Sequence, residues 1–336
     1  MSKKRTGIVF VLLTMLLLCM ICISILLGSV RIGLGETVSV LTGHTDDATH
    51  ANIIWNIRLP RALAAVILGG ALALSGYLLQ TFFANPIVGP FVLGISSGAK
   101  LTVALCMIFL LSAGKIISAT GMVFAAFLGA MIAMGFVLLI SVKVKNMSLL
   151  VVCGIMIGYI CSAVTDLLVT FADDSSIVNL HNWSMGSLSG ISMHDVLIMT
   201  VVIFFCFAGS VLLSKPIGAY RLGEAYAKNM GVNIRMLRIL LILLSSLSAA
   251  CVTAFAGPIS FVGIATPHLI KNIMKTTKPQ VMIPGVFLGG ALITLLCDGI
   301  ARTVFAPTEV SISSVTAVLL VPVVIVMMVR RKKEVH

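Results

Sequence analysis

Charged residues are scarce in this chain. Asp, Glu, Lys and Arg make up 10% of its 336 residues, whereas hydrophobic residues make up 59%. A soluble domain carries about 25% charged residues, so a water-soluble fold of this length could not cover its surface with polar groups. The mean hydropathy of +1.16 points the same way. The sequence therefore predicts an all-α integral membrane protein.

Motifs of nucleotide-binding and zinc-dependent enzymes are absent as well. The sequence contains no GxxxxGK[ST] phosphate loop and no HExxH pair, which are the signals for ATP hydrolysis and for one class of zinc protease. Cys19 and Cys22 have CxxC spacing, but they lie in an apolar run and are interpreted as packing residues. We expect no catalytic residue, no cofactor and no metal site in this chain.

The net charge of +12 does not indicate nucleic-acid binding. Lys and Arg occur in short clusters between long apolar runs, without a basic face or interleaved aromatic residues. In a membrane protein such clusters mark the cytoplasmic loops. With the N-terminus inside and ten alternating spans, most of the 23 basic residues fall inside and most of the 11 acidic residues fall outside. Both termini are therefore expected in the cytoplasm.

Long uncharged stretches locate the membrane-spanning helices, each of which needs about 20 apolar residues. The first run is too long for a signal peptide and more spans follow it. Asn85-Pro86 and Gly89-Pro90 divide a later stretch into two helices, because proline and the residue before it disfavour helix. We expect a single transmembrane domain, 1–336, with about ten spans near 6–30, 61–82, 91–112, 117–142, 148–171, 193–213, 236–255, 259–274, 283–304 and 312–329.

Two polar segments are too long to be simple turns. Residues 31–60 are expected to form an external loop with a short surface helix. Residues 214–235 form the long cytoplasmic loop, which is predicted to be helical in its centre with Gly223 and Gly231 at the two ends. The simplest interpretation is a solvated connector, but a structured loop bounded by glycines favours a contact with a cytoplasmic partner.

Ionisable side chains inside spans are costly in hydrocarbon and are therefore candidates for function. Asp298 can pair with Arg302 one helical turn later. Asp166 has no such neighbour and either lines a water-filled pathway or pairs with a residue distant in sequence. Gln80 and Asn85, at the end of the second span, are further pathway candidates.

Arg58, Arg61 and Arg302 are predicted at the external ends of their helices, against the general inside bias of basic residues. Such charges often only extend to the membrane interface. Three arginines on one external face would also attract an acidic partner outside the cell. Both interpretations remain open at this stage.

Gly94-Ile-Ser96-Ser-Gly98 matches the GxSxG pattern of serine hydrolases. In those enzymes the serine lies on a strained strand–turn–helix and is activated by a histidine and an acid. Here the string opens a predicted membrane helix, where small residues more often permit close helix packing. An intramembrane serine protease with Ser96 and His268 remains an alternative.

Three blocks distributed over almost the whole chain carry a family resemblance. They are Arg58-Leu-Pro60-Arg61 through Asn85-Pro86 to Leu93-Gly94-Ile-Ser-Ser-Gly98, then Leu222-Gly223-Glu224-Ala225 through Met230-Gly231-Val232, and finally Gly257-Pro258 through Pro267-His268 to Asp298 and Arg302. In their order and spacing these blocks resemble the FecCD family, the permease subunits of importers for iron siderophores, haem and vitamin B12.

The resemblance implies a type II ABC importer permease of the inner membrane. Its expected partners are a second permease (an identical copy or a paralogue), two cytoplasmic ABC ATPase subunits and an external substrate-binding protein. It implies docking of that protein on Arg58, Arg61 and Arg302, and contact of an ATPase with a coupling helix. The residues that match this coupling segment are Leu222, Gly223, Glu224, Ala225, Met230, Gly231 and Val232.

The substrate that the resemblance favours is a ferric siderophore, with haem and cobalamins as further possibilities. Two other functions stay open from the residues alone. One is an ATP-independent secondary transporter or channel that uses Asp166 as an ion or proton site. The other is the intramembrane protease.

Overall fold

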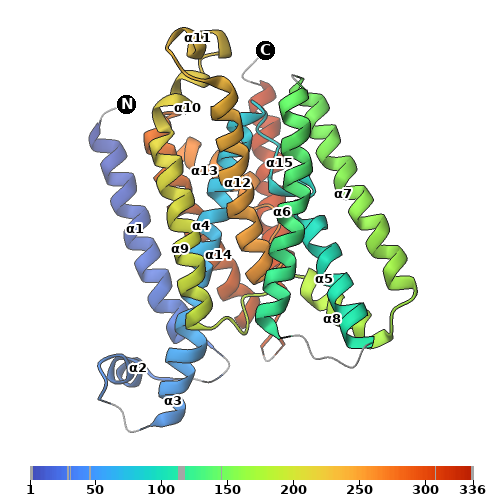
Figure 1. Cartoon of the computed structure of the whole chain (residues 1–336). Helices are drawn as coiled ribbons and strands as arrows, with labels where there is room; N and C mark the ends of the chain where they lie inside the picture. The colour runs from blue at the N-terminus through green and yellow to red at the C-terminus, as the bar shows by residue number, and fades with distance from the viewer. Residues whose placement is uncertain are drawn as a thin grey trace.

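The computed structural model describes residues 3–28, 30, 32–44, 47–112, 118–144, 146–306 and 308–333. Every regular element in these ranges is a helix (Figure 1). Residue 117, the expected start of the fourth span, lies outside the described residues.

Each of the ten stretches expected to span the membrane contains a helix. These helices are α1 (Lys3–Leu26), α4 (Leu59–Phe82), α5 (Ile95–Ser112), α6 (Ala119–Lys143), α7 (Met147–Thr170), α9 (Met193–Leu212), α12 (Ile234–Ala256), α13 (Val262–Met274), α14 (Pro279–Thr303) and α15 (Ile312–Lys333). Within the described residues, seven helices are long and apolar enough to cross a membrane. The other three are α5 and α15, of which only shorter apolar parts are fully described, and α13, which has 13 residues. The number of ten spans therefore stays a prediction.

The polar segments also fold into helices. The external loop contains two helices instead of the one expected, α2 (Leu34–Leu41) and α3 (Ala48–Asn52), and a π-helical stretch, Ile53–Arg58, makes α3 continuous with α4. A further short helix, α8 (Asp174–Ser184), follows α7, and a 3-10 turn, Pro90–Leu93, precedes α5.

The two ends of the helix bundle differ in what they carry (Figure 1). The long cytoplasmic loop forms α10 (Ser214–Tyr220) and α11 (Glu224–Asn229), at the end where α1 begins and α15 finishes. Helices α2, α3 and α8 lie at the opposite end. This arrangement agrees with the orientation predicted from the basic residues, so the end that carries α11 is assigned to the cytoplasm.

Helix α4 lies in the middle of the bundle and packs against α12, α13 and α14. Glycines allow its backbone to approach these neighbours closely. A Cβ atom added to Gly69 would lie 2.6 Å from the carbonyl oxygen of Gly290 on α14, and one added to Gly290 would lie 2.3 Å from that of Gly69. Water does not drive apolar helices together inside a bilayer, so such close van der Waals packing supplies much of the association.

The tightest approach joins α4 to α13. A Cβ atom on Gly76 would lie 1.7 Å from the carbonyl oxygen of Gly263, a separation that no side chain can adopt. We predict that Gly76→Ala forces the two helices apart and destabilises the protein by about 1–3 kcal/mol or more, the usual cost of overpacking. The midpoint of thermal unfolding of the purified protein in detergent measures the effect.

Gly135→Ala is the matched control, because a Cβ atom on Gly135 of α6 would meet nothing within 4 Å. Alanine is also the better helix former. If both variants unfold at the temperature of the original protein, the close approach of α4 and α13 is not a requirement of the fold.

Candidate functional site

Helix α11 is bounded by glycines in conformations that other residues rarely adopt. Gly223 precedes it at φ +126°, and Gly231 follows it at φ +80°. Around Gly231, the backbone N–H of Val232 donates to Ala227 O at 3.0 Å, which closes the helix in a Schellman-type turn. The prediction of a central helix with glycine at each end is confirmed.

One face of this helix carries apolar side chains into the solvent. Leu222, Tyr226 and Met230 are 71%, 47% and 64% exposed. Tyr226 and the C-cap residue Met230 are four residues apart and so lie on one side of α11, whereas Leu222 lies just before the helix. Ala227 is completely buried and holds the helix against the bundle. We call the three exposed residues the α11 stripe.

Two polar contacts tie this loop to the body of the protein. The guanidinium of Arg238, on α12, donates to the Glu224 carboxylate at 2.8 Å. The guanidinium of Arg221 donates to the backbone carbonyl of Thr277, in the connection between α13 and α14, at 2.6 Å. These two contacts link the α11 loop to α12 and to the connection before α14.

A cavity of about 420 Å³ lies beneath this loop. Gln80, Arg221, Glu224 and Lys271 are among the residues that line it, and they come from α4, the loop itself and α13. The cavity therefore connects the α11 region with the cytoplasmic end of the central helix α4.

The amide of Gln80 bridges α4 and α13. Because Pro267 has no N–H, it leaves the carbonyl of Gly263, four residues earlier, without its helical donor. The side-chain nitrogen of Gln80 lies 3.5 Å from this oxygen and 3.2 Å from the carbonyl oxygen of Ile264. Gln80 thus lines the cavity while its amide holds a proline-interrupted helix.

The other pathway candidates lie apart from Gln80. Asn85 closes a local turn, because its side-chain oxygen accepts the backbone N–H of Ile87 at 3.0 Å. Asp166 lies one turn from the external end of α7 and is exposed on the surface of this single chain. None of the described residues pairs with the Asp166 carboxylate. The structure therefore does not bring the three predicted pathway residues together.

The Ser96–His268 pair belongs to the alternative protease interpretation. Nε2 of His268 lies 2.9 Å from the carbonyl oxygen of Pro86, so this ring ties α13 to the loop after α4. Ser96 lies in the first turn of α5, a helix and not the strand–turn–helix of a hydrolase. The geometry favours packing and structural roles for both residues.

At the external end, Asp298 is completely buried between two arginines. The Arg61 guanidinium lies 3.0 Å from one carboxylate oxygen of Asp298, and Nε of Arg302 lies 3.1 Å from the other. Arg61 also pairs with Glu309 at 2.9 Å. The predicted Asp298–Arg302 pair is confirmed, as one half of a larger cluster.

Two of the arginines also cap the end of α1. The Arg58 guanidinium donates to Ile25 O at 2.9 Å, to Leu26 O at 3.0 Å and to Val30 O. The Arg302 guanidinium donates to the Ser24 hydroxyl at 2.7 Å. The bonds to the carbonyls of Ile25 and Leu26 satisfy groups that a helix end leaves without partners.

The three predicted docking arginines therefore meet on one external face, but they do not project into solvent. Arg58, Arg61 and Arg302 are only 4%, 7% and 8% exposed. Together with Glu309 they line a cavity of about 160 Å³. Sequence reasoning overlooked Glu309 and the Arg61–Asp298 pair, whose partners are 237 residues apart. We call these five side chains, including Asp298, the external arginine cluster.

Comparisons with known proteins agree with this architecture. Residues 16–330 match the model of the FecCD transport family. The chain is 34% identical over 284 residues to the hemin transport system permease protein HmuU of Yersinia pestis, a match that covers 84% of each chain. It is 34% identical over 277 residues to the vitamin B12 import system permease protein BtuC of Salmonella typhi, covering 81% of this chain and 82% of the relative.

Solved structures share the fold. An inward-facing structure of an ABC transporter assigned to the metal-chelate type matches with a TM-score of 0.85 and 30% identity, over 96% of this chain and 99% of that one. The structure of PsaBC from Streptococcus pneumoniae in complex with Fab matches with a TM-score of 0.51 and 16% identity, over 86% of this chain and 94% of that one. The second likeness concerns the fold alone.

We predict that Asp298→Ala destabilises the protein by about 3–5 kcal/mol, because it leaves Arg61 and Arg302 buried without their shared counter-charge. Asp166→Ala removes the other acid of a predicted span, yet it should change stability by no more than about 0.5 kcal/mol, since that carboxylate is exposed and unpaired. Thermal unfolding of both variants in the same detergent makes the comparison. An equal loss of thermal stability in the two variants would show that Asp298 does not hold the external arginine cluster together.

Proposed function

The chain belongs to the FecCD transport family, and from this premise we propose that it carries an iron chelate across the inner membrane into the cytoplasm. It is the permease subunit of an ATP-binding-cassette importer of the type that handles haem, vitamin B12 or metal chelates. More specifically, we propose a ferric siderophore as the substrate, with haem and cobalamins as the next candidates. ATP is hydrolysed by partner subunits.

The observation that carries this proposal is the α11 stripe. Three large apolar side chains exposed to the cytoplasm are unfavourable in an isolated subunit and are explained by a protein that covers them. We assign this surface to a cytoplasmic ABC ATPase, with Leu222, Gly223, Glu224, Ala225, Met230, Gly231 and Val232 as the coupling segment. The contacts of Glu224 and Arg221 then transmit the closure of the ATPases to α12 and α14.

A second permease copy, or a paralogue, is proposed to cover α7. This helix packs against α5, α6 and the turn before α5, and only 11% of its apolar window is buried. In a dimer joined along this face, Asp166 would lie at the external mouth of a central pathway instead of in lipid. Its place near the end of α7 argues against the secondary-transporter alternative, because such carriers bind coupling ions near the bilayer midplane.

The external arginine cluster is proposed to receive the substrate-binding protein. Its three arginines face only two acids, so it keeps one positive charge in excess. Glu309 is the accessible acid of the cluster, with 45% of its side chain exposed. An acidic residue of the binding protein would enter the cavity of about 160 Å³ and replace Glu309 at Arg61. Docking by exchange of an accessible acid does not require the arginines to project into solvent, so it agrees with their burial.

Purification from native membranes with a mild detergent tests the assembly. We expect a stoichiometric ATPase with a phosphate loop to co-purify, and we expect the reconstituted complex to accumulate ferric siderophore only with ATP. Glu224→Arg should lower transport per ATP hydrolysed by about two- to thirtyfold, because it places two cations together where α11 contacts α12 and so weakens the coupling.

The double variant Glu224→Arg with Arg238→Glu restores the pair inside the chain and serves as the control. Recovery of transport would assign Glu224 to holding α11, whereas continued uncoupling would assign it to direct contact with the ATPase. Normal coupling in the single variant would contradict the assignment of α11. A lone polypeptide that still transports would contradict the importer proposal itself.

A second prediction concerns docking. Glu309→Gln should raise the affinity for the binding protein by about two- to fivefold, the value of a partly exposed ion pair, because the competing acid is gone. Asp173→Asn makes the same change of charge on the external side, where the Asp173 side chain makes no capping hydrogen bond. Binding is measured by surface plasmon resonance on nanodiscs. An equal gain in both variants, or no gain in Glu309→Gln, would contradict the displacement of Glu309.

A further inference from the structure

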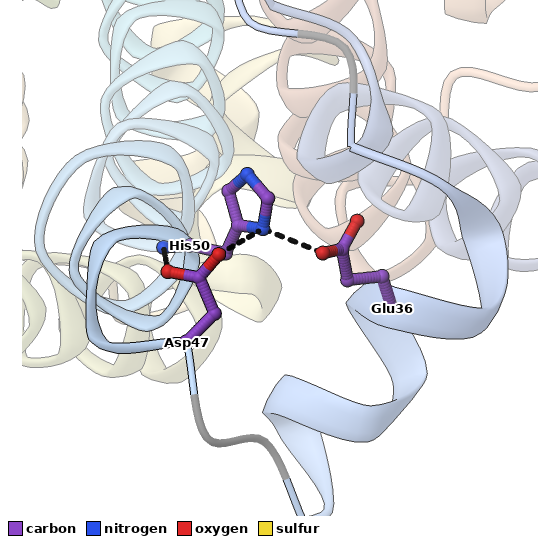
Figure 2. Close-up of side chains that lie close together, drawn as sticks. All are labelled: Glu36, Asp47 and His50. Carbon is purple, nitrogen blue, oxygen red and sulfur yellow. Dashed lines mark hydrogen bonds and ion pairs between the residues drawn. The ribbon is translucent and has the colours of Figure 1, made fainter.

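Three metal-ligating side chains converge at the external end, away from the arginine cluster. Nδ1 of His50 lies 2.6 Å from a carboxylate oxygen of Glu36 and 3.1 Å from a carboxylate oxygen of Asp47. The three ligand atoms all lie within 4.8 Å of one another. Figure 2 shows the two carboxylates on either side of the imidazole, pointing toward the same ring nitrogen.

The local fold places each of these side chains. Glu36 lies in the first turn of α2, which Thr37 and Val40 anchor to the bundle. Asp47 is the N-cap of α3; one of its oxygens accepts the backbone N–H groups of Thr49 and His50, and the other faces the His50 ring. His50 lies on α3, which continues through the π-helical stretch into α4.

The same bonds also stabilise one of the three side chains. The backbone N–H of His50 and then that of Thr49 stabilise the carboxylate of Asp47, so its pKa lies below the ordinary value. The side chains of Glu36 and Asp47 are 41% and 45% exposed and that of His50 is 23% exposed, so the cluster is accessible from the external solution.

The chemistry of this set favours a transition metal. Imidazole nitrogen suits Zn²⁺ and its neighbours in the periodic table, whereas Ca²⁺ and Mg²⁺ prefer sites made of oxygen alone. Around Zn²⁺, bonds of about 2.0–2.2 Å place tetrahedral ligand atoms about 3.3 Å apart. The two separations from His50 Nδ1, 2.6 and 3.1 Å, would expand to about this value, and all three ligand atoms already lie within 4.8 Å of one another. A metal ion would take the position of the proton that His50 Nδ1 otherwise donates to Glu36.

We propose that Glu36, Asp47 and His50 form a binding site for a divalent transition-metal ion, best fitted by Zn²⁺, with the remaining coordination positions open to water. The bound ion joins α2 to the N-terminal end of the continuous α3–α4 helix. It thereby fixes the external loop beside the helix that carries Arg58 and Arg61. The site does not depend on which substrate the importer carries.

Sequence reasoning expected no metal site, and the spacing explains why. His50 follows Asp47 by three residues, but Glu36 precedes Asp47 by eleven and lies on a different helix. No recognised metal motif has this pattern. The site becomes visible only in the folded chain, where α2 and α3 are in contact.

Titration of the tag-free, full-length protein in nanodiscs with Zn²⁺ tests the site. We expect one equivalent of Zn²⁺ to bind, and we expect His50→Gln to weaken that binding at least about tenfold, since loss of even an outer partner of a metal site costs about 10–100-fold. Glu36→Gln should act in the same direction. An excess of Mg²⁺ or Ca²⁺ should not displace the ion.

His44→Gln is the matched control, because His44 lies in the same loop and its Nδ1 contacts the carbonyl oxygen of Thr42 instead of the cluster. Co²⁺ as a second probe reports the ligands through its visible spectrum and separates nitrogen and oxygen ligation from binding to the cysteines. Equal binding by the original protein and His50→Gln, equal loss in both histidine variants, or a thiolate spectrum would each overturn the proposal.

Discussion

Close contact between the backbones of α4 and its neighbours is the constraint on which the rest of the structure depends. Gly69 on α4 faces Gly290 on α14, and Gly76 faces Gly263 on α13, at separations that leave no room for a side chain. The bilayer offers no hydrophobic force between helices, so this packing must come from shape. The polar clusters at both ends are built on the helices that these glycines bring together.

The same contacts relate the two ends of the molecule. Helix α4 carries Arg61 near its external end and Gln80 near its cytoplasmic end, while α14 carries Asp298 outside and begins beside the loop that Arg221 holds. Closely packed helices shift between discrete arrangements and do not deform continuously. Under the proposed function, a displacement of α11 would therefore reach the external arginine cluster through a pair of helices that move together.

The sequence was sufficient for features that depend on local pattern. Hydropathy located all ten helices, the glycines at 223 and 231 delimited α11, and spacing of one turn identified the Asp298–Arg302 pair. Features that depend on distant contacts were missed. Three contacts join different elements, and no periodicity in the sequence encodes them. They are Asp298 with Arg61, Arg61 with Glu309, and His50 with Glu36. The burial of the arginines could not be foreseen for the same reason, since it depends on the end of α1 lying against them.

The burial of these arginines bears on their function. A buried Arg–Asp–Arg arrangement rarely stabilises a protein more than well-packed apolar residues would, because the cost of desolvating the charges offsets their attraction. Arg58 adds a third buried cation. Among the described residues its guanidinium donates only to backbone carbonyls, which satisfy its hydrogen bonds without neutralising its charge. For stability alone this surplus of positive charge is unfavourable. The surplus charge is explained if the cluster binds a carboxylate of the external binding protein. Glu309 then pairs with Arg61 until that carboxylate replaces it.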